Sequence, residues 1–97
     1  DLVYQLALNF AQASLGHNVK VPTMDGKQEL KIPPGTQSGR DFVFKGKGVP
    51  HLHGRGKGDL VVQVSVVTPS SLTKEQRRLL EKLADTLGTP EIPAEEA

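Results

Sequence analysis

The chain has 97 residues, enough for one domain with a modest core, and its twelve basic and eleven acidic side chains leave a net charge of +1. That balance excludes a strong overall attraction to nucleic acid or to anionic membranes. The absence of cysteine excludes disulfides and thiolate metal sites, and no apolar run approaches the roughly 20 residues of a membrane helix. We expect a soluble domain from a reducing compartment, cut from a longer protein because it starts at Asp1 without methionine.

The first residues predict a strand followed by a short helix. Apolar residues alternate with others over residues 2–8, which gives the strand one apolar face. Asn9 can cap the six residues FAQASL, and Gly16 ends them. The short helix is therefore expected directly after the strand.

A hairpin is predicted next. Val19 and Val21 indicate a brief strand, and residues 30–32 return as its partner. Asp25-Gly26 between them is typical of a type I′ turn, in which both central residues need positive φ.

The segment from Lys31 to Val67 is the most distinctive part of the sequence. Pro34 and Gly35 predict a tight turn, Phe42 and Phe44 a short strand, and residues 60–66 a strand with one apolar face. The loop between the last two holds five glycines and is expected to be flexible and at the surface.

The residues of this loop and its surroundings bear on nucleotide binding, metal binding and catalysis. It fits no nucleotide fingerprint, because no Gly-Lys pair is followed by Ser or Thr. His51, His53 and Asp59 offer too few ligands for a metal site, so no metal and no cofactor is expected. There is no cysteine nucleophile and no G-x-S-x-G elbow, which argues against an enzyme.

A basic strip keeps one alternative function open. Lys45, Lys47, Arg55 and Lys57 could contact single-stranded nucleic acid, although only four aromatic residues exist to stack on bases. Nucleic acid is therefore a secondary expectation, held beside a purely structural dimerisation module.

After Pro69 the apolar period changes to that of a helix. Thr73 and Gln76 form a capping-box pattern, and Gly88 with Pro90 ends the run. One stripe of this helix can pack on its own sheet or pair with a second chain, and its residues are Leu79, Leu80, Leu83, Ala84 and Leu87. We divide the chain into a β-domain (1–69), a helical segment (70–88) and an acidic tail expected to be disordered (89–97).

These patterns together resemble a known family. The run GTQSGRDFVFKGKGVPHLHGRGKGDLVVQV is similar to the second C-terminal β-domain of the DnaJ co-chaperones, and LNFAQASLG and LTKEQRRLLEKL flank it in matching order. The resemblance covers residues 1–88 and implies a mainly β fold of two small stacked sheets, a short internal helix and a C-terminal amphipathic helix. Asp1-Leu2-Val3 also matches Asp59-Leu60-Val61, and in this family such a strand recurs at domain junctions.

The resemblance also implies a function. It suggests a cytoplasmic, non-enzymatic co-chaperone piece that holds unfolded polypeptide clients, forms homodimers and serves a DnaK-type chaperone through its parent protein. The positions that match the family's client pocket, carried over from the first β-domain, are Tyr4, Leu6, Val19 and Val21; as buried residues they would simply be core. The expected dimer contact comprises Leu72, Leu79, Leu80, Leu83 and Leu87. The His-Pro-Asp tripeptide of the J-domain and the Cys-x-x-Cys zinc repeats are absent from this sequence.

Overall fold

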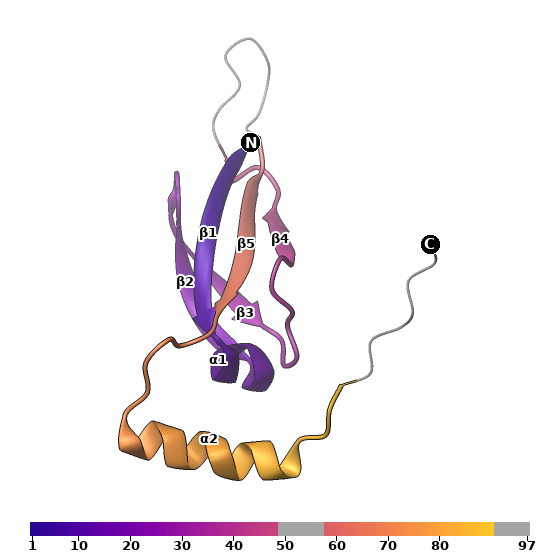
Figure 1. The fold of residues 1–97 in the computed structure, drawn as a ribbon. Helices are drawn as coiled ribbons and strands as arrows, with labels where there is room; N and C mark the ends of the chain where they lie inside the picture. The colour runs from indigo at the N-terminus through magenta and orange to yellow at the C-terminus, as the bar shows by residue number, and fades with distance from the viewer. Residues whose placement is uncertain (49–57, 91–97) are drawn as a thin grey trace.

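A computed structural model of the chain describes residues 1–48 and 58–90, which form five strands and two helices. In chain order these are β1 (Leu2–Asn9), α1 (Phe10–Leu15), β2 (His17–Thr23), β3 (Gly26–Ile32), β4 (Asp41–Phe44), β5 (Leu60–Val67) and α2 (Lys74–Thr86) (Figure 1). The prediction of a mainly β fold with two sheets, a short internal helix and a C-terminal helix is confirmed.

The strands form one three-stranded and one two-stranded sheet. The larger sheet has the order β1-β5-β4, with β5 parallel to β1 and antiparallel to β4. The smaller sheet is the antiparallel hairpin of β2 and β3. Both sheets contribute to one core cluster, whose buried members are Leu8, Val21, Leu30, Ile32, Leu60, Val62 and Val64.

The parallel pairing of β1 and β5 explains the repeated motif at residues 1–6 and 59–64. The two copies pair in register, with Leu2 opposite Leu60 and Gln5 opposite Gln63. The Gln5 amide donates to the Gln63 amide oxygen at 2.7 Å, so identical residues on adjacent strands form a cross-strand bond. Matching sequence thus corresponds to direct pairing within this domain.

The short helix and the proline-glycine turn stabilise each other. Asn9 and Gln12 form a capping box at the start of α1. Gly35 adopts a φ of 79°, as the predicted turn requires, and its N–H donates to the Ala13 carbonyl at 2.9 Å. Thr36, only 4% exposed, donates its backbone N–H to the same carbonyl, so the turn closes the carboxyl end of α1.

The hairpin of β2 and β3 is confirmed, but the predicted turn type is wrong. The two turn residues are Met24 and Asp25, and Gly26 already pairs with Thr23. Neither turn residue has positive φ, whereas Gly26 has a φ of 116°. The Thr23 hydroxyl donates to the Gly26 carbonyl at 2.6 Å, and this local bond helps to close the turn one residue earlier than the Asp-Gly pattern suggests.

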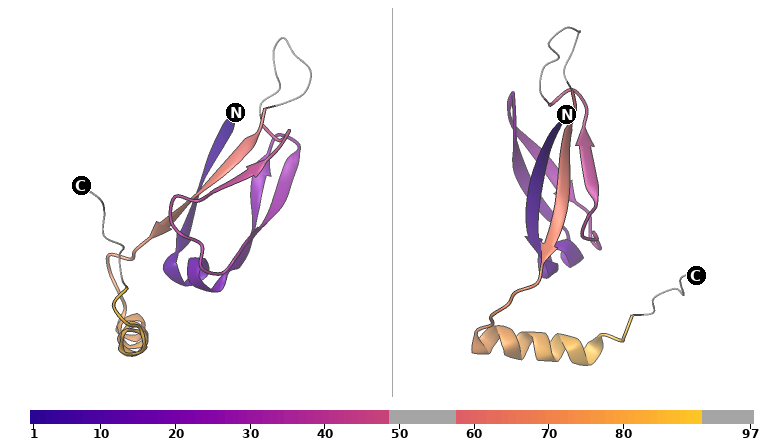
Figure 2. Two further views of the ribbon diagram at one scale, coloured as in Figure 1. Left: turned by 90° about the vertical axis from the view of Figure 1, so that its right-hand side faces the viewer. Right: turned by 45° about the horizontal axis from the view of Figure 1, so that its top comes forward.

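Helix α2 lies apart from both sheets in every view (Figures 1 and 2). Thr73 and Gln76 form the predicted capping box, and Glu75 pairs with Arg78 at 2.6 Å in the first turns. Leu87 is the C-cap, directly before Gly88, and no residue of the helix is buried. Residues 91–97, most of the tail expected to be disordered, lie outside the described residues.

Candidate functional site

The four predicted client positions come from two different sheets. Tyr4 and Leu6 lie on β1, half-buried, and Val19 lies half-buried on β2. All three pack against the core cluster, and Val21, 0% exposed, belongs to it. The fold therefore brings the four residues to the core-facing sides of the two sheets, with Val21 covered by its neighbours.

β1 has one strand edge without a strand partner in the described part of the chain. The sheet order places it at the edge of the three-stranded sheet, with β5 on its other side. An edge strand presents unpaired N–H and C=O groups to any extended segment that approaches. The half-buried Tyr4 and Leu6 alternate along this strand, so pairing at its edge would bring a ligand next to them.

The five predicted dimer leucines divide into two groups. Leu72 and Leu80 are half-buried. Leu79, Leu83 and Leu87 are 53%, 42% and 63% exposed, which is high for large apolar side chains on one helix. These three leucines, spaced four residues apart, form an exposed stripe along α2 and its C-cap.

The half-buried leucines border a groove of about 660 Å³. Its walls come from the end of β1, the start of α1, the segment that links β5 to α2, and the first half of α2. The lining residues are Ala7, Leu8, Asn9, Phe10, Ala11, Val67, Pro69, Ser71, Leu72, Gln76, Leu79 and Leu80. None of them is charged.

Sequence reasoning did not find the contribution of α1 to this groove. Phe10 and Ala11 were assigned only to a short helix, and Pro69 only to a domain boundary. The available signal was Phe10 at the first helical position, an aromatic residue outside the strand pattern. Its proximity to α2 depends on the path of residues 68–73, which no local pattern predicts.

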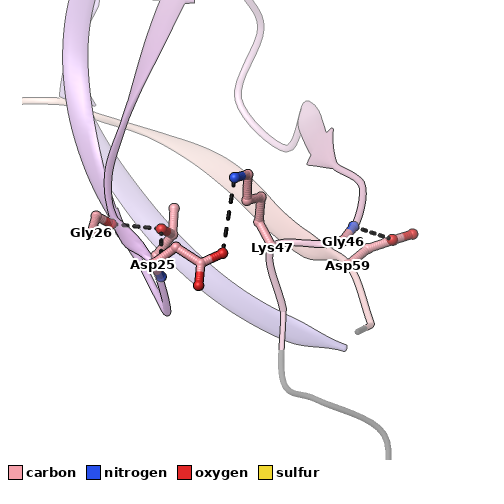
Figure 3. Close-up of polar contacts among 6 residues, drawn as sticks. Asp25, Gly26, Gly46, Lys47 and Asp59 are labelled. Atoms are coloured by element: carbon pink, nitrogen blue, oxygen red, sulfur yellow. Dashed lines mark hydrogen bonds and ion pairs between the residues drawn. The ribbon is translucent and has the colours of Figure 1, made fainter. Parts of the chain in front are cut away.

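Polar contacts join the strand ends at the opposite end of the domain (Figure 3). The Asp25 carboxylate at the hairpin turn lies 3.9 Å from the Lys47 ammonium. The Asp59 carboxylate accepts a hydrogen bond from the Gly46 N–H at 3.2 Å. The first contact joins the β2–β3 hairpin to the segment after β4, and the second joins the end of β4 to the start of β5, where the chain enters and leaves the glycine-rich loop.

Four of the residues weighed as ligands lie outside the described residues, namely His51, His53, Arg55 and Lys57. The structure therefore does not test the expectation that His51, His53 and Asp59 form no metal site, nor does it place half of the basic strip. Among residues 1–48 and 58–90, no three His, Cys, Asp or Glu residues are grouped so that they could hold a metal ion. Likewise, none of the helices described is long and apolar enough to cross a membrane.

The described residues define a class of fold. They form a five-stranded domain of two small sheets with an open strand edge on β1, and a helix with exposed leucines follows this domain.

Comparison with known proteins identifies the family. Residues 1–69 match the family model described as DnaJ C terminal domain. A Chaperone protein DnaJ of Roseiflexus sp. (strain RS-1) is 55% identical over 87 residues, which is 90% of this chain and 24% of the relative. The Chaperone protein DnaJ of Haloferax mediterranei is 52% identical over 88 residues, which is 91% of this chain and 23% of the relative. That of Lysinibacillus sphaericus is 47% identical over 96 residues, which is 99% of this chain and 26% of the relative. The chain belongs to the DnaJ C-terminal domain family, a chaperone family, and spans about a quarter of the length of these relatives.

Proposed function

We propose that this chain binds unfolded polypeptide and joins two copies of itself, so that its parent protein can deliver clients to a DnaK-type chaperone. Membership of the DnaJ C-terminal domain family supports the chaperone role. The role is binding without catalysis, and it uses no cofactor within this chain. Because the sequence has no His-Pro-Asp tripeptide, we expect that the chain does not by itself stimulate an ATPase.

The open edge of β1 is the observation that supports the proposed binding of unfolded polypeptide. An extended peptide can add a strand to an exposed sheet edge, where backbone hydrogen bonds give affinity and alternate side chains give selectivity. The half-buried side chains of β1 include the two predicted client positions Tyr4 and Leu6. A client strand with apolar residues at alternate positions would cover them.

A purely structural reading of the same residues remains a second candidate. The full burial of Val21, together with the core contacts of Tyr4, Leu6 and Val19, favours it. In that case the β-domain only supports the dimerisation helix and has no affinity for clients.

Leu6→Ser separates the two readings when it is compared with Val66→Ser. Both residues are half-buried, pack on the core and lie in the larger sheet, but Val66 is on β5, away from the open edge. Each change should cost about 1–3 kcal/mol of unfolding free energy, since it removes apolar contacts. We expect only Leu6→Ser to weaken binding of a reduced, carboxymethylated polypeptide, measured by fluorescence anisotropy at equal fractions of folded protein. Equal losses in the two variants would support the structural reading.

The exposed leucines of α2 support the proposed dimerisation. Fully burying a leucine is worth about 1.5–3 kcal/mol, so covering the exposed half of six leucines, three per chain, gives roughly 5–9 kcal/mol. Association costs on the order of 4–15 kcal/mol. The stripe alone therefore supports at most a weak dimer, and a stable one needs further apolar surface.

A further inference from the structure

We propose that Asp25 is a site of spontaneous covalent modification, at which the folded chain converts aspartate to isoaspartate through a cyclic succinimide. Asp25 is the second turn residue of the β2–β3 hairpin and directly precedes Gly26. This pair occurs once, because no other Asp or Asn in the sequence is followed by glycine. The chemistry concerns the hairpin turn alone and does not depend on the proposed function.

The reaction needs only the turn residues and water. The backbone nitrogen of Gly26 attacks Cγ of Asp25, a new N–Cγ bond closes a five-membered ring, and the N–H proton leaves with the carboxyl OH as water. Water then adds to one of the two ring carbonyls and breaks its bond to nitrogen. Opening at the Cγ carbonyl restores aspartate, whereas opening at the other carbonyl leaves the chain running through Cγ, with one extra methylene in the backbone.

Gly26 leaves the attacking nitrogen uncrowded. Its φ is 116°, and a Cβ at this position would meet no atom of the described residues within 4 Å. Because glycine has no side chain, nothing attached to it hinders the approach of the Asp25 carboxyl. Every other Asp in the chain is followed by a residue with a side chain beside the nitrogen, so ring closure is more hindered there.

The Asp25 side chain is accessible and loosely held. It is 46% exposed, and its carboxylate lies 3.9 Å from the Lys47 ammonium at the surface (Figure 3). Exposed ion pairs of this kind hold a side chain only weakly in one geometry. By contrast, Asp41 lies within β4 and Asp85 within α2, where regular backbone hydrogen bonds resist the distortion that ring closure requires.

Thr23 restrains the reaction. Its hydroxyl accepts from the Asp25 N–H at 3.2 Å and donates to the Gly26 carbonyl at 2.6 Å, so two hydrogen bonds flank the reacting peptide. Such local bonds hold a turn backbone in one geometry, and the planar ring distorts that geometry. Thr23→Val keeps the branched shape of the side chain but removes the hydroxyl, and it should therefore speed the conversion.

The product differs from the parent chain at the hairpin. The extra methylene lengthens the connection between β2 and β3, and Cγ becomes part of the main chain, so the carboxylate that contacts Lys47 is lost from its place. Strands joined by a distorted turn open locally more often. We expect the amides of β2 and β3 to exchange hydrogen faster in the purified isomer than in the parent chain, and those of α2 to exchange at the same rate.

Incubation of the full chain at neutral pH, followed by peptide mapping with mass spectrometry, tests the site. Isoaspartate is counted with an isoaspartyl methyltransferase, which moves the methyl group of S-adenosylmethionine onto the free carboxylate of the isomer. We expect several-fold more isoaspartate at position 25 than at any other Asp, and several-fold faster formation in Thr23→Val. Asp25→Glu is the control, because it keeps a carboxylate but would have to close a larger ring, and it should form none.

A parallel incubation in urea gives the rate for the unfolded chain. If isoaspartate forms at position 25 in urea but not in the folded chain, the folded turn prevents ring closure and the inference is wrong. Equal amounts at Asp25 and Asp41 in the folded chain also overturn it, since Asp41 lies within a strand. A Thr23→Val variant that stays folded by circular dichroism and reacts at the parent rate would overturn the role assigned to Thr23.

Discussion

Gly48 is a position where we expect even one added methyl group to destabilise the fold. It is buried where the chain enters the glycine-rich loop, and its N–H donates to the Gly58 carbonyl at 2.9 Å. A Cβ at this position would overlap the backbone carbonyl of Asp59, which cannot move without disturbing the start of β5. The glycine is needed here because two backbone segments approach each other closely.

Gly48→Ala should therefore lower the free energy of unfolding by about 1–3 kcal/mol, the usual cost of overpacking. Urea denaturation followed by far-ultraviolet circular dichroism measures this change. Gly88→Ala is the control, because a Cβ there meets nothing within 4 Å and should leave stability unchanged or slightly raised. A Gly48→Ala variant as stable as the parent chain would mean that the loop ends can separate at little cost.

At the scale of elements, local sequence patterns predicted where helices and strands form better than they predicted which strands pair. The strand alternation of residues 2–8 and the capping box at Thr73 were sufficient for β1 and α2, since both depend on neighbouring residues alone. The parallel partnership of β1 with β5 joins residues 58 positions apart and was not predicted. For the same reason the leucines of α2 could be named from the sequence, but not the groove wall supplied by Phe10 and Ala11.

Thr73 links the formation of α2 to dimerisation. The helix has 13 residues and buries none, and isolated helices of this length are marginal in water. Thr73→Ala removes an N-cap worth about 1 kcal/mol. If α2 forms fully only when two copies associate, the N-cap energy is lost in both chains of the dimer. The dimer dissociation constant should then rise by roughly 10- to 30-fold.

Sedimentation equilibrium and circular dichroism at 222 nm, recorded over the same concentration range, test this coupling. Thr86→Ala is the matched control: its hydroxyl donates to the Leu83 carbonyl at the far end of α2, where no N-cap is lost. We expect the helicity of the parent chain to rise with protein concentration, and that of Thr73→Ala to rise only at higher concentrations. Helicity that is independent of concentration in both would show that α2 is already complete in the monomer.

At the scale of the whole molecule, we expect the β-domain and α2 to be separable. The buried core cluster lies within residues 8–64, and no residue of α2 is buried. In Figure 1 the helix lies apart from both sheets. A chain that ends at Pro69 should therefore keep its fold and a similar melting temperature, because it loses almost none of the apolar area that is buried on folding. It should also lose the exposed leucines and with them the proposed dimer contact.

Sedimentation equilibrium of the full chain and of the chain ending at Pro69 completes the argument. We expect the full chain to pass from monomer to dimer as its concentration rises, and the shorter chain to remain a folded monomer throughout. A shorter chain that still dimerises would place the contact on the β-domain, with the open edge of β1 as the first surface to mutate. A shorter chain that unfolds would instead show that the segment after β5 stabilises the core in solution, and the division between β-domain and helix would have to be abandoned.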